Sequence, residues 1–233
     1  QVTKPYKLAS RETHQEGSII HVGNVQFGDG NAVMIAGPCA VESLEQTLRI
    51  ADSVENRGAQ ILRGGAYKPR TSPYSFQGLG EEGLKILAEA REKTGLPFVT
   101  EVLDTETISV VAQYADMLQI GMRNMQNFTL LKEVGKAGKP VLMKRGMSAT
   151  LEETLMSAEY LMVNGCRDVV ICERGVRTFG NHARNTLDIS VVPALKQVSH
   201  LPIIIDPSHS SGHRYSVIPH ALAGIGAGAD GLI

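Results

Sequence analysis

DVVICERG, residues 168–175, is the stretch that decides the fold: four apolar residues stand together and charged residues follow at once. Short apolar runs of this kind recur roughly every 20–40 residues along the chain. Each is rich in Val, Ile, Leu or Met, which is typical of a strand buried on both faces in a parallel sheet. The other runs are AVMIAG (32–37), AQILRGG (59–65), PFVTEV (97–102), DMLQIG (116–121), PVLMKRG (140–146), PIIIDPSH (202–209) and DGLI (230–233).

Amphipathic segments between the apolar runs predict helices, of which the clearest cover 43–58, 80–95, 149–165 and 186–200. Several of these have residues suited to cap a helix start, Ser43 and Ser148, or to end a helix, Gly58, Gly95 and Gly165. Eight strands with interleaved helices predict an α/β fold, a (β/α)₈ or TIM barrel over residues 31–233. A doubly wound open sheet is the structural alternative, but no G-x-G-x-x-G follows the first run.

The two ends of the chain depart from the barrel pattern. GSIIHVGNVQFGDG (17–30) alternates and contains Gly-Asn and Gly-Asp-Gly, which predicts a small β-hairpin within an N-terminal extension, residues 1–30. At the other end the chain stops inside the eighth apolar run, with no eighth helix. Because a closed barrel needs that strand completed and covered, we expect the protein to continue beyond Ile233.

Composition narrows the class of protein. The 233 residues are 42% hydrophobic and carry a net charge of −1. The protein therefore lacks the overall positive field that would attract nucleic acids or anionic membranes. The sequence has no apolar run of membrane-spanning length and no signal peptide at its start. Three scattered cysteines argue against a disulfide framework. We expect a cytoplasmic enzyme or small-molecule binder.

Cationic residues follow most of the predicted strands. Barrel enzymes place their chemistry at the carboxyl ends of the strands, so these side chains should gather at one rim. Unpaired, each buried charge would cost several kcal/mol, which predicts two phosphorylated ligands, or a phosphate and a carboxylate, between them. The alternative is a set of ordinary ion pairs with Glu101, Glu173 and Asp206. The cations are Arg63, Lys68, Arg70, Arg123, Lys144, Arg145 and Arg174.

Cys39 and His209 form a second candidate feature. Each follows a Gly-Pro or Asp-Pro exit from a predicted strand, and a closed ring would bring the two together across the last strand. Thiolate and imidazole suit a borderline divalent metal. A buried apolar cysteine and a hydrogen-bonded histidine are the alternatives. We interpret Cys166 and Cys172 as core and helix-end residues.

Segment 63–72, RGGAYKPRTS, combines glycines, cations and hydroxyls and is suited to wrap a phosphate. It lacks the G-x-x-x-x-G-K-[ST] pattern, and a passive surface loop is the alternative. We interpret the glycines of 224–228 as packing residues.

The sequence resembles the 3-deoxy-D-arabino-heptulosonate-7-phosphate (DAHP) synthases, in the subgroup called type I-beta. The resemblance extends over almost the whole chain, and its matching blocks come in the same order. These blocks are KPYKLASRE (4–12), AGPCAVES (36–43), LRGGAYKPRTSPYSFQGLG (62–80), IGMRNMQN (120–127), LMKRGMSAT (142–150), ICERGVRTF (171–179), RNTLD (184–188) and DPSHSSG (206–212).

The resemblance implies a barrel that condenses phosphoenolpyruvate with erythrose 4-phosphate, the first step of the shikimate route to aromatic amino acids. It implies a homo-oligomer, dimeric or tetrameric, and a divalent metal such as Mn²⁺, Fe²⁺, Zn²⁺ or Co²⁺. Cys39 and His209 match two of four metal ligands, and the other two, a Glu and an Asp, would lie beyond Ile233. The phosphoenolpyruvate pocket would comprise Arg63, Lys68, Arg123, Lys144 and Arg174, and the erythrose-phosphate site Lys68, Pro69, Arg70 and Thr71, with Asp206 near the sugar hydroxyls.

In the reaction that the resemblance implies, the metal polarises the aldehyde oxygen while C3 of phosphoenolpyruvate attacks the aldehyde carbon. Water adds at C2, and phosphate leaves by C–O cleavage. Lys68 is the candidate for proton delivery, and Glu101 or Glu173 for positioning the water. Two alternatives remain. One is 3-deoxy-manno-octulosonate 8-phosphate synthase, which carries a KANRSS-like segment where this chain reads KPRTS; the other is a non-catalytic phosphometabolite-binding barrel.

Overall fold

The computed structural model describes residues 3–233, so residues 1–2 of the predicted extension lie outside the described residues. Eight parallel strands close into a barrel in the order β10-β3-β4-β5-β6-β7-β8-β9. Each of the eight apolar runs contains one of them, which confirms the predicted barrel. The strands are β3 (Val33–Ala36), β4 (Ile61–Arg63), β5 (Phe98–Glu101), β6 (Met117–Ile120), β7 (Val141–Lys144), β8 (Val169–Glu173), β9 (Ile203–Ile205) and β10 (Gly231–Leu232).

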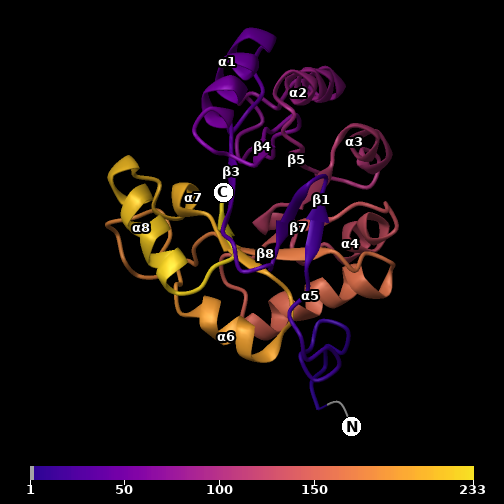
Figure 1. Cartoon of the computed structure of the whole chain (residues 1–233), viewed down its shortest axis with the longest axis vertical. Helices are drawn as coiled ribbons and strands as arrows, with labels where there is room; N and C mark the ends of the chain where they lie inside the picture. Colours follow the sequence, from indigo (N-terminus) through magenta and orange to yellow (C-terminus); the bar gives the residue numbers. More distant parts are fainter. Residues whose placement is uncertain (1–2) are drawn as a thin grey trace.

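Helices surround the strands as an outer ring, and the C-terminus lies beside β3 in the centre (Figure 1). Among the described residues, no helix has the length and apolar character needed to cross a membrane. The helices are α1 (Leu44–Glu55), α2 (Glu81–Thr94), α3 (Ile108–Tyr114), α4 (Phe128–Gly135), α5 (Leu151–Val163), α6 (Val191–Val198), α7 (Pro207–Ser211) and α8 (Arg214–Gly226), with a 3₁₀ turn at Met122–Asn124.

The predicted helix ends are partly correct. Ser43 caps α1 by accepting a hydrogen bond from the backbone of Gln46, and Gly95 follows α2 in the left-handed conformation. Ser148 was the wrong cap for α5. Thr150 takes that place, because its side chain and that of Glu153 bond each other's backbone N–H groups in a capping box.

The helix predicted over 186–200 is also shorter than expected, since α6 begins only at Val191. Residues before it have other partners. Thr186 pairs with Val176 through two backbone hydrogen bonds, and the Asp188 carboxylate accepts from Arg145. These contacts fix the connection from β8 to α6 as a loop that returns to the carboxyl end of the barrel.

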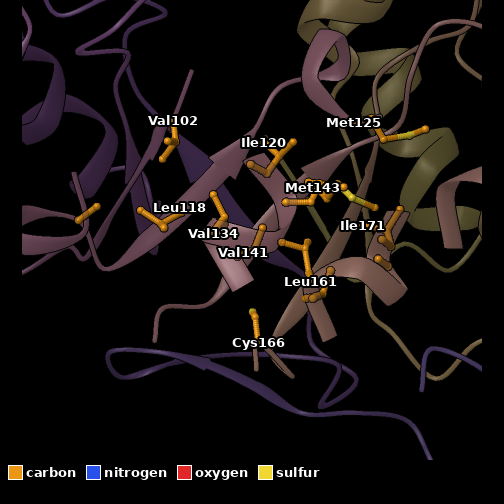
Figure 2. Close-up of a cluster of buried hydrophobic side chains, with 14 of the residues drawn as sticks. Val102, Leu118, Ile120, Met125, Val134, Val141, Met143, Leu161, Cys166 and Ile171 are labelled. Carbon is orange, nitrogen blue, oxygen red and sulfur yellow. The ribbon is translucent and has the colours of Figure 1, made fainter. Parts of the chain in front are cut away.

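Side chains alternate along each strand, and this separates two cores. Outward-facing residues pack against the helices, as shown in Figure 2 for Leu118 and Ile120 of β6 and Val141 and Met143 of β7. Inward-facing residues fill the barrel interior. This inner cluster comprises Val33, Ile35, Ile61, Val99, Met117, Leu142, Val170, Cys172, Ile204 and Ile233, together with residues of an N-terminal hairpin.

That hairpin is formed by β1 (Ile20–Val22) and β2 (Val25–Phe27), as predicted for residues 17–30. Its inward side chains, among them Ile20 and Phe27, are almost fully buried in the same inner cluster. The hairpin therefore covers the inner cluster at the amino-terminal end of the barrel, and the cationic cavity lies at the carboxyl end.

The packing predictions are confirmed for the two cysteines and for Gly224, but not for Gly226 and Gly228, where a Cβ atom would meet nothing within 4 Å. Cys166 and Cys172 are buried, and burial raises the pKa of the Cys166 thiol to about 12. Gly224 lies within α8, where a Cβ atom would stand 1.9 Å from Cδ1 of Ile205. The glycine at 224 thus lets α8 approach β9.

Candidate active site

Side chains continue to alternate beyond the apolar core toward the carboxyl end of the barrel. The next inward-facing residue on several strands is polar, and these residues form the site. Ile61 is followed two residues later by Arg63, Val99 by Glu101, and Leu142 by Lys144. The resulting layer of polar side chains forms the floor of a cavity of about 440 Å³ at the carboxyl end of the barrel. Its lining residues are Cys39, Arg63, Lys68, Pro69, Arg70, Thr71, Ser72, Ser75, Glu101, Gln119, Gly121, Met122, Arg123, Lys144, Arg174, Arg184 and His209.

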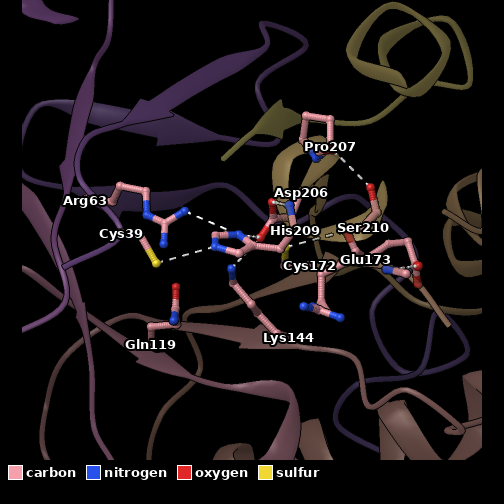
Figure 3. Close-up of polar contacts among 12 residues, drawn as sticks. Cys39, Arg63, Gln119, Lys144, Cys172, Glu173, Asp206, Pro207, His209 and Ser210 are labelled. Atoms are coloured by element: carbon pink, nitrogen blue, oxygen red, sulfur yellow. Dashed lines mark hydrogen bonds and ion pairs between the residues drawn. The ribbon is translucent and has the colours of Figure 1, made fainter. Parts of the chain in front are cut away.

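Every residue predicted for the metal site or the two substrate sites, except Asp206, therefore lines this cavity. Asp206 has no exposed surface and lies behind Lys144 and His209 (Figure 3). Its carboxylate accepts hydrogen bonds from Lys144 Nζ at 2.6 Å, His209 Nδ1 at 2.7 Å and the His209 backbone at 2.9 Å. Burial alone raises the pKa of Asp206, but Lys144 and His209 hold it far below its usual range. Asp206 thus fixes two cavity side chains in place.

Cys39 and His209 meet, as predicted. Sγ of Cys39 lies 3.7 Å from Nε2 of His209, and the two side chains point toward each other in Figure 3. Lys68 Nζ donates to the Cys39 carbonyl at 2.6 Å and lies 3.3 Å from its Sγ. The His209 hydrogen bond, together with the charges of Lys68 and Arg63, lowers the pKa of the Cys39 thiol to about 6 although burial opposes this.

Among the described residues, Glu101 is the one carboxylate that lines the cavity. Burial raises its pKa, and the nearby cations Lys68 and Lys144 oppose this. Gly121 makes room for it, because a Cβ atom there would lie 2.0 Å from Oε1 of Glu101. Gln119 Nε2 lies 3.4 Å from its other oxygen. This carboxylate therefore faces the cavity without a direct ion pair.

The loop after β4 contains the predicted phosphate-wrapping segment, residues 63–72. Gly65 allows Lys68 to fold back, since a Cβ atom at Gly65 would lie 2.5 Å from Cδ of Lys68. The Lys68 backbone donates to the Gln77 carbonyl at 2.8 Å, and Arg70 Nε donates to the Phe76 carbonyl at 3.1 Å. The loop thus presents cations and hydroxyl groups to the cavity.

Arg145 does not belong to the cavity, contrary to the prediction that it joins the cationic rim. It follows the inward-facing Lys144 and points outward, where Nη1 bonds Glu173 at 2.9 Å and Asp188 at 2.8 Å. Glu173 is also outward-facing and fully buried, so it does not reach the cavity as a water-positioning group would. The ion-pair interpretation holds for these residues.

Arg184 is a cavity residue that the sequence reasoning missed. It lies within the RNTLD block (184–188), but it comes several residues after the end of β8 rather than at the strand end. Its neighbour Asn185 accepts a hydrogen bond from Arg174 Nη1 at 2.8 Å. The return of this loop to the barrel mouth, which the sequence pattern does not display, brings Arg184 to the cavity.

The cavity has seven arginine or lysine side chains and one carboxylate at the open end of a (β/α)₈ barrel. Such a site defines an enzyme that acts on small, multiply anionic substrates. Among residues 3–233, no three or more His, Cys, Asp or Glu side chains gather in a way that would hold a metal.

Comparison with known proteins identifies the family. The model of the DAHP synthetase I family matches residues 9–233. The phospho-2-dehydro-3-deoxyheptonate aldolase of Thermotoga maritima is 54% identical over 233 residues, which are all of this chain and 69% of that protein. The crystal structure of the Thermotoga maritima DAHP synthase matches with a TM-score of 0.95 at 52% identity, covering 100% of this chain and 68% of that one.

A more distant relative has a different sugar product in its name. The 2-dehydro-3-deoxyphosphooctonate aldolase of Acidithiobacillus ferrooxidans is 32% identical over 217 residues, which cover 85% of this chain and 76% of that protein. The chain belongs to the DAHP synthetase I family, and its activity is DAHP synthesis, the first step of the shikimate pathway.

Proposed function

We propose that the cavity holds phosphoenolpyruvate at its buried end and erythrose 4-phosphate toward its rim. The observation that carries this placement is the excess of seven cations over one lining carboxylate. Phosphoenolpyruvate brings a phosphate and a carboxylate, and the sugar brings a second phosphate. Three anionic groups balance the cations far better than one would.

Phosphoenolpyruvate takes the predicted pocket of Arg63, Lys68, Arg123, Lys144 and Arg174. Lys144 and Arg174 are buried, and each is held by a polar partner: Asp206 for Lys144 and Asn185 for Arg174. Because these donors are fixed before the substrate arrives, they need no reorganisation as negative charge develops. They orient the substrate so that C3 faces the aldehyde.

Erythrose 4-phosphate takes the segment Lys68, Pro69, Arg70 and Thr71, all of which line the cavity. Its aldehyde points inward, toward Lys68 and the facing Cys39–His209 pair. Asp206, which we predicted near the sugar hydroxyls, is buried and acts on this substrate through Lys144 and His209.

In the reaction, C3 of phosphoenolpyruvate forms a bond to the aldehyde carbon, water adds at C2, and the C2–O bond to phosphate breaks. Lys68 donates a proton to the aldehyde oxygen, because its ammonium group already lies beside Cys39 at the cavity wall. Glu101 orients the attacking water, since it is the one carboxylate in the cavity lining and Glu173 does not reach it.

The Cys39–His209 pair fits a divalent metal. Nδ1 of His209 contacts Asp206, which leaves Nε2, the nitrogen that faces Sγ of Cys39, as the one that would ligate a metal. At metal–sulfur and metal–nitrogen lengths of about 2.3 and 2.1 Å, two tetrahedral ligands stand roughly 3.6 Å apart. The observed separation is 3.7 Å. A divalent metal at this position supplies Lewis-acid polarisation of the aldehyde oxygen.

Metal content tests this assignment directly. After incubation with Mn²⁺ and gel filtration, Cys39→Ser and His209→Gln should each retain much less metal than the wild-type protein. Cys166→Ser is the matched control, because that thiol is buried away from the cavity. Equal metal retention by the wild-type protein and both site variants would refute the assignment.

Calorimetric titration with phosphoenolpyruvate tests the substrate placement. We expect Arg174→Ala to weaken binding roughly 10- to 100-fold, since a hydrogen bond to a charged group contributes about 1.5–3 kcal/mol. Arg177→Ala is the control, because Arg177 is exposed on the same loop but does not line the cavity. Equal affinities of the Arg174→Ala and control variants would contradict the placement.

The resemblance also supports a homo-oligomer, dimeric or tetrameric, in the cytoplasm. Light scattering of the purified protein tests the oligomeric state, and a mass of one chain would refute it.

A further inference from the structure

Arg184 is the cavity cation that neither the predicted phosphoenolpyruvate pocket nor the predicted sugar-phosphate segment includes. Among residues 3–233, its guanidinium group has no carboxylate within ion-pair distance. The buried cations differ, because Lys144 bonds Asp206 and Arg174 bonds Asn185. Arg184 thus points an unpaired charge into a cavity that is already cationic.

The backbone that carries Arg184 is firmly held. Its N–H donates to the Ser211 carbonyl at 2.9 Å, and the N–H of Asn185 donates to Ser210 at 2.8 Å. Gly212 provides a flat surface for the side chain, since a Cβ atom there would lie 3.3 Å from Nε of Arg184. The side chain is therefore anchored at its base, with its charged head presented to the cavity.

Arg184 also has a like-charged neighbour. Burial lowers the pKa of Arg174, and the charges of Arg184 and Arg123 lower it further, against the opposing effect of Asp206. Two guanidinium groups held near each other without an acid between them favour an anion. Arg174 is buried and Arg184 is exposed, so Arg184 presents its charge nearer the cavity mouth.

The same cavity mouth carries Arg70 and three exposed hydroxyl residues, Thr71, Ser72 and Ser75. They come from the loop after β4, whereas Arg184 comes from the loop after β8. Forked guanidinium donors from two loops, with hydroxyl groups beside them, are the groups that recognise a terminal phosphate.

We propose that Arg184 binds the phosphate group of the aldehyde substrate, together with Arg70, and so contributes to selection of a phosphorylated aldose. This inference rests on the proposed placement of erythrose 4-phosphate at the rim. It leaves the five cations of the predicted phosphoenolpyruvate pocket to that substrate and assigns Arg70 and Arg184 to the sugar phosphate. Arg184 is then a substrate-binding residue.

Steady-state kinetics of the Mn²⁺-loaded protein test this role with Arg184→Ala and Arg184→Gln. We expect the KM for erythrose 4-phosphate to rise roughly 10- to 100-fold, as loss of a charge-assisted hydrogen bond to phosphate predicts. The KM for phosphoenolpyruvate should stay within about twofold of wild type, because all five cations of its predicted pocket remain. With unphosphorylated erythrose, both variants should match the wild-type protein, since no phosphate is present to lose a partner.

Arg177→Ala serves as the control on the same loop, and thermal unfolding shows whether each variant keeps its fold. An unchanged KM for erythrose 4-phosphate would overturn the inference, as would an equal loss of activity toward erythrose. A rise confined to the KM for phosphoenolpyruvate would move Arg184 to the other substrate and also overturn it. Absence of wild-type turnover would instead refute the proposed substrate placement, and the inference with it.

Discussion

Gly121 is the residue on which the position of the cavity carboxylate depends. Its backbone has φ of −69°, which any residue adopts, so alanine there adds volume without backbone strain. The new Cβ would meet Oε1 of Glu101 at 2.0 Å, and the carboxylate must move. We predict that Gly121→Ala lowers kcat by at least about tenfold, because a positioned acid–base group contributes roughly 10²–10⁴-fold and the displaced carboxylate loses part of this. Thermal stability should change little.

Gly226→Ala is the matched control for this experiment, because nothing lies within 4 Å of a Cβ at that helical position. It should leave kcat and the melting temperature unchanged, because the added methyl group at the end of α8 meets no other group. Full activity in Gly121→Ala would show that Glu101 can move without consequence, and would remove it from the reaction.

At the residue scale, sequence reasoning succeeds where a side chain follows its strand directly. Lys144 and Asp206 face inward because the alternation continues from Leu142 and Ile204. The same reasoning assigns Arg145 wrongly when all cations near a strand end are counted together, without regard to which face each occupies. Arg184 depends on how a loop folds back, and no periodic pattern encodes that.

At the scale of elements, Arg145 joins three segments around the carboxyl end of the barrel. It extends from the end of β7 to Glu173 of β8 and to Asp188 before α6. Hydrogen bonds from Arg145 and Ser190 hold the pKa of Asp188 below its usual range, although burial opposes them. The loop that carries Arg184 is thereby tied to the barrel.

Removing the Arg145 side chain should lower the free energy of unfolding. Arg145→Met leaves the buried Glu173 without its cationic partner, and breaking a buried pair in this way costs about 3–5 kcal/mol. Chemical denaturation measures the change. The double variant Arg145→Met/Glu173→Gln should recover part of the loss, because the unpaired charge is gone. If Arg145→Met were as stable as the wild-type protein, the network would have no structural role.

Strands were the most predictable elements and helix boundaries the least. A strand buried on both faces reads as a continuous apolar run, which is why all eight apolar runs contain barrel strands. The start of α6 depends instead on Thr186 and Asp188 bonding to distant residues. The choice of Thr150 over Ser148 depends on which hydroxyl can bond Glu153.

At the scale of the whole molecule, the N-terminal segment is fastened to the barrel by contacts between residues far apart in the sequence. Glu159 of α5 accepts hydrogen bonds from the backbone of Leu8 and Ala9, both at 2.9 Å. His200 bonds the Leu8 carbonyl at 2.6 Å and the Ser18 hydroxyl at 2.7 Å. Sequence patterns do not display such pairs, although they do predict the hairpin that follows.

His200 makes this attachment pH-dependent. Burial lowers its pKa from the ordinary value of 6.5, and the charged or titratable groups that face it are His14, Arg11 and Glu159. Since the folded state resists protonation, the contribution of His200 to stability is complete above pH 6.5. It is lost as the pH falls from there through the lowered folded-state pKa.

We therefore predict that the melting temperature of the wild-type protein falls with pH below 6.5 more steeply than that of His200→Gln. At pH 8 the variant should have a lower melting temperature than the wild-type protein, because it loses the hydrogen bonds of His200 to Leu8 and Ser18. Parallel curves for the two proteins between pH 8 and pH 5, scanned at about one-unit steps, would show that another group controls the pH dependence.

The central claim is that one cationic cavity joins phosphoenolpyruvate to a four-carbon sugar phosphate. Product formation from phosphoenolpyruvate, with erythrose 4-phosphate and arabinose 5-phosphate in parallel, tests it most directly, with Mn²⁺ and again with a chelator. The account predicts turnover of the four-carbon sugar that the chelator abolishes. Turnover of arabinose 5-phosphate alone, or turnover of neither sugar, would contradict it.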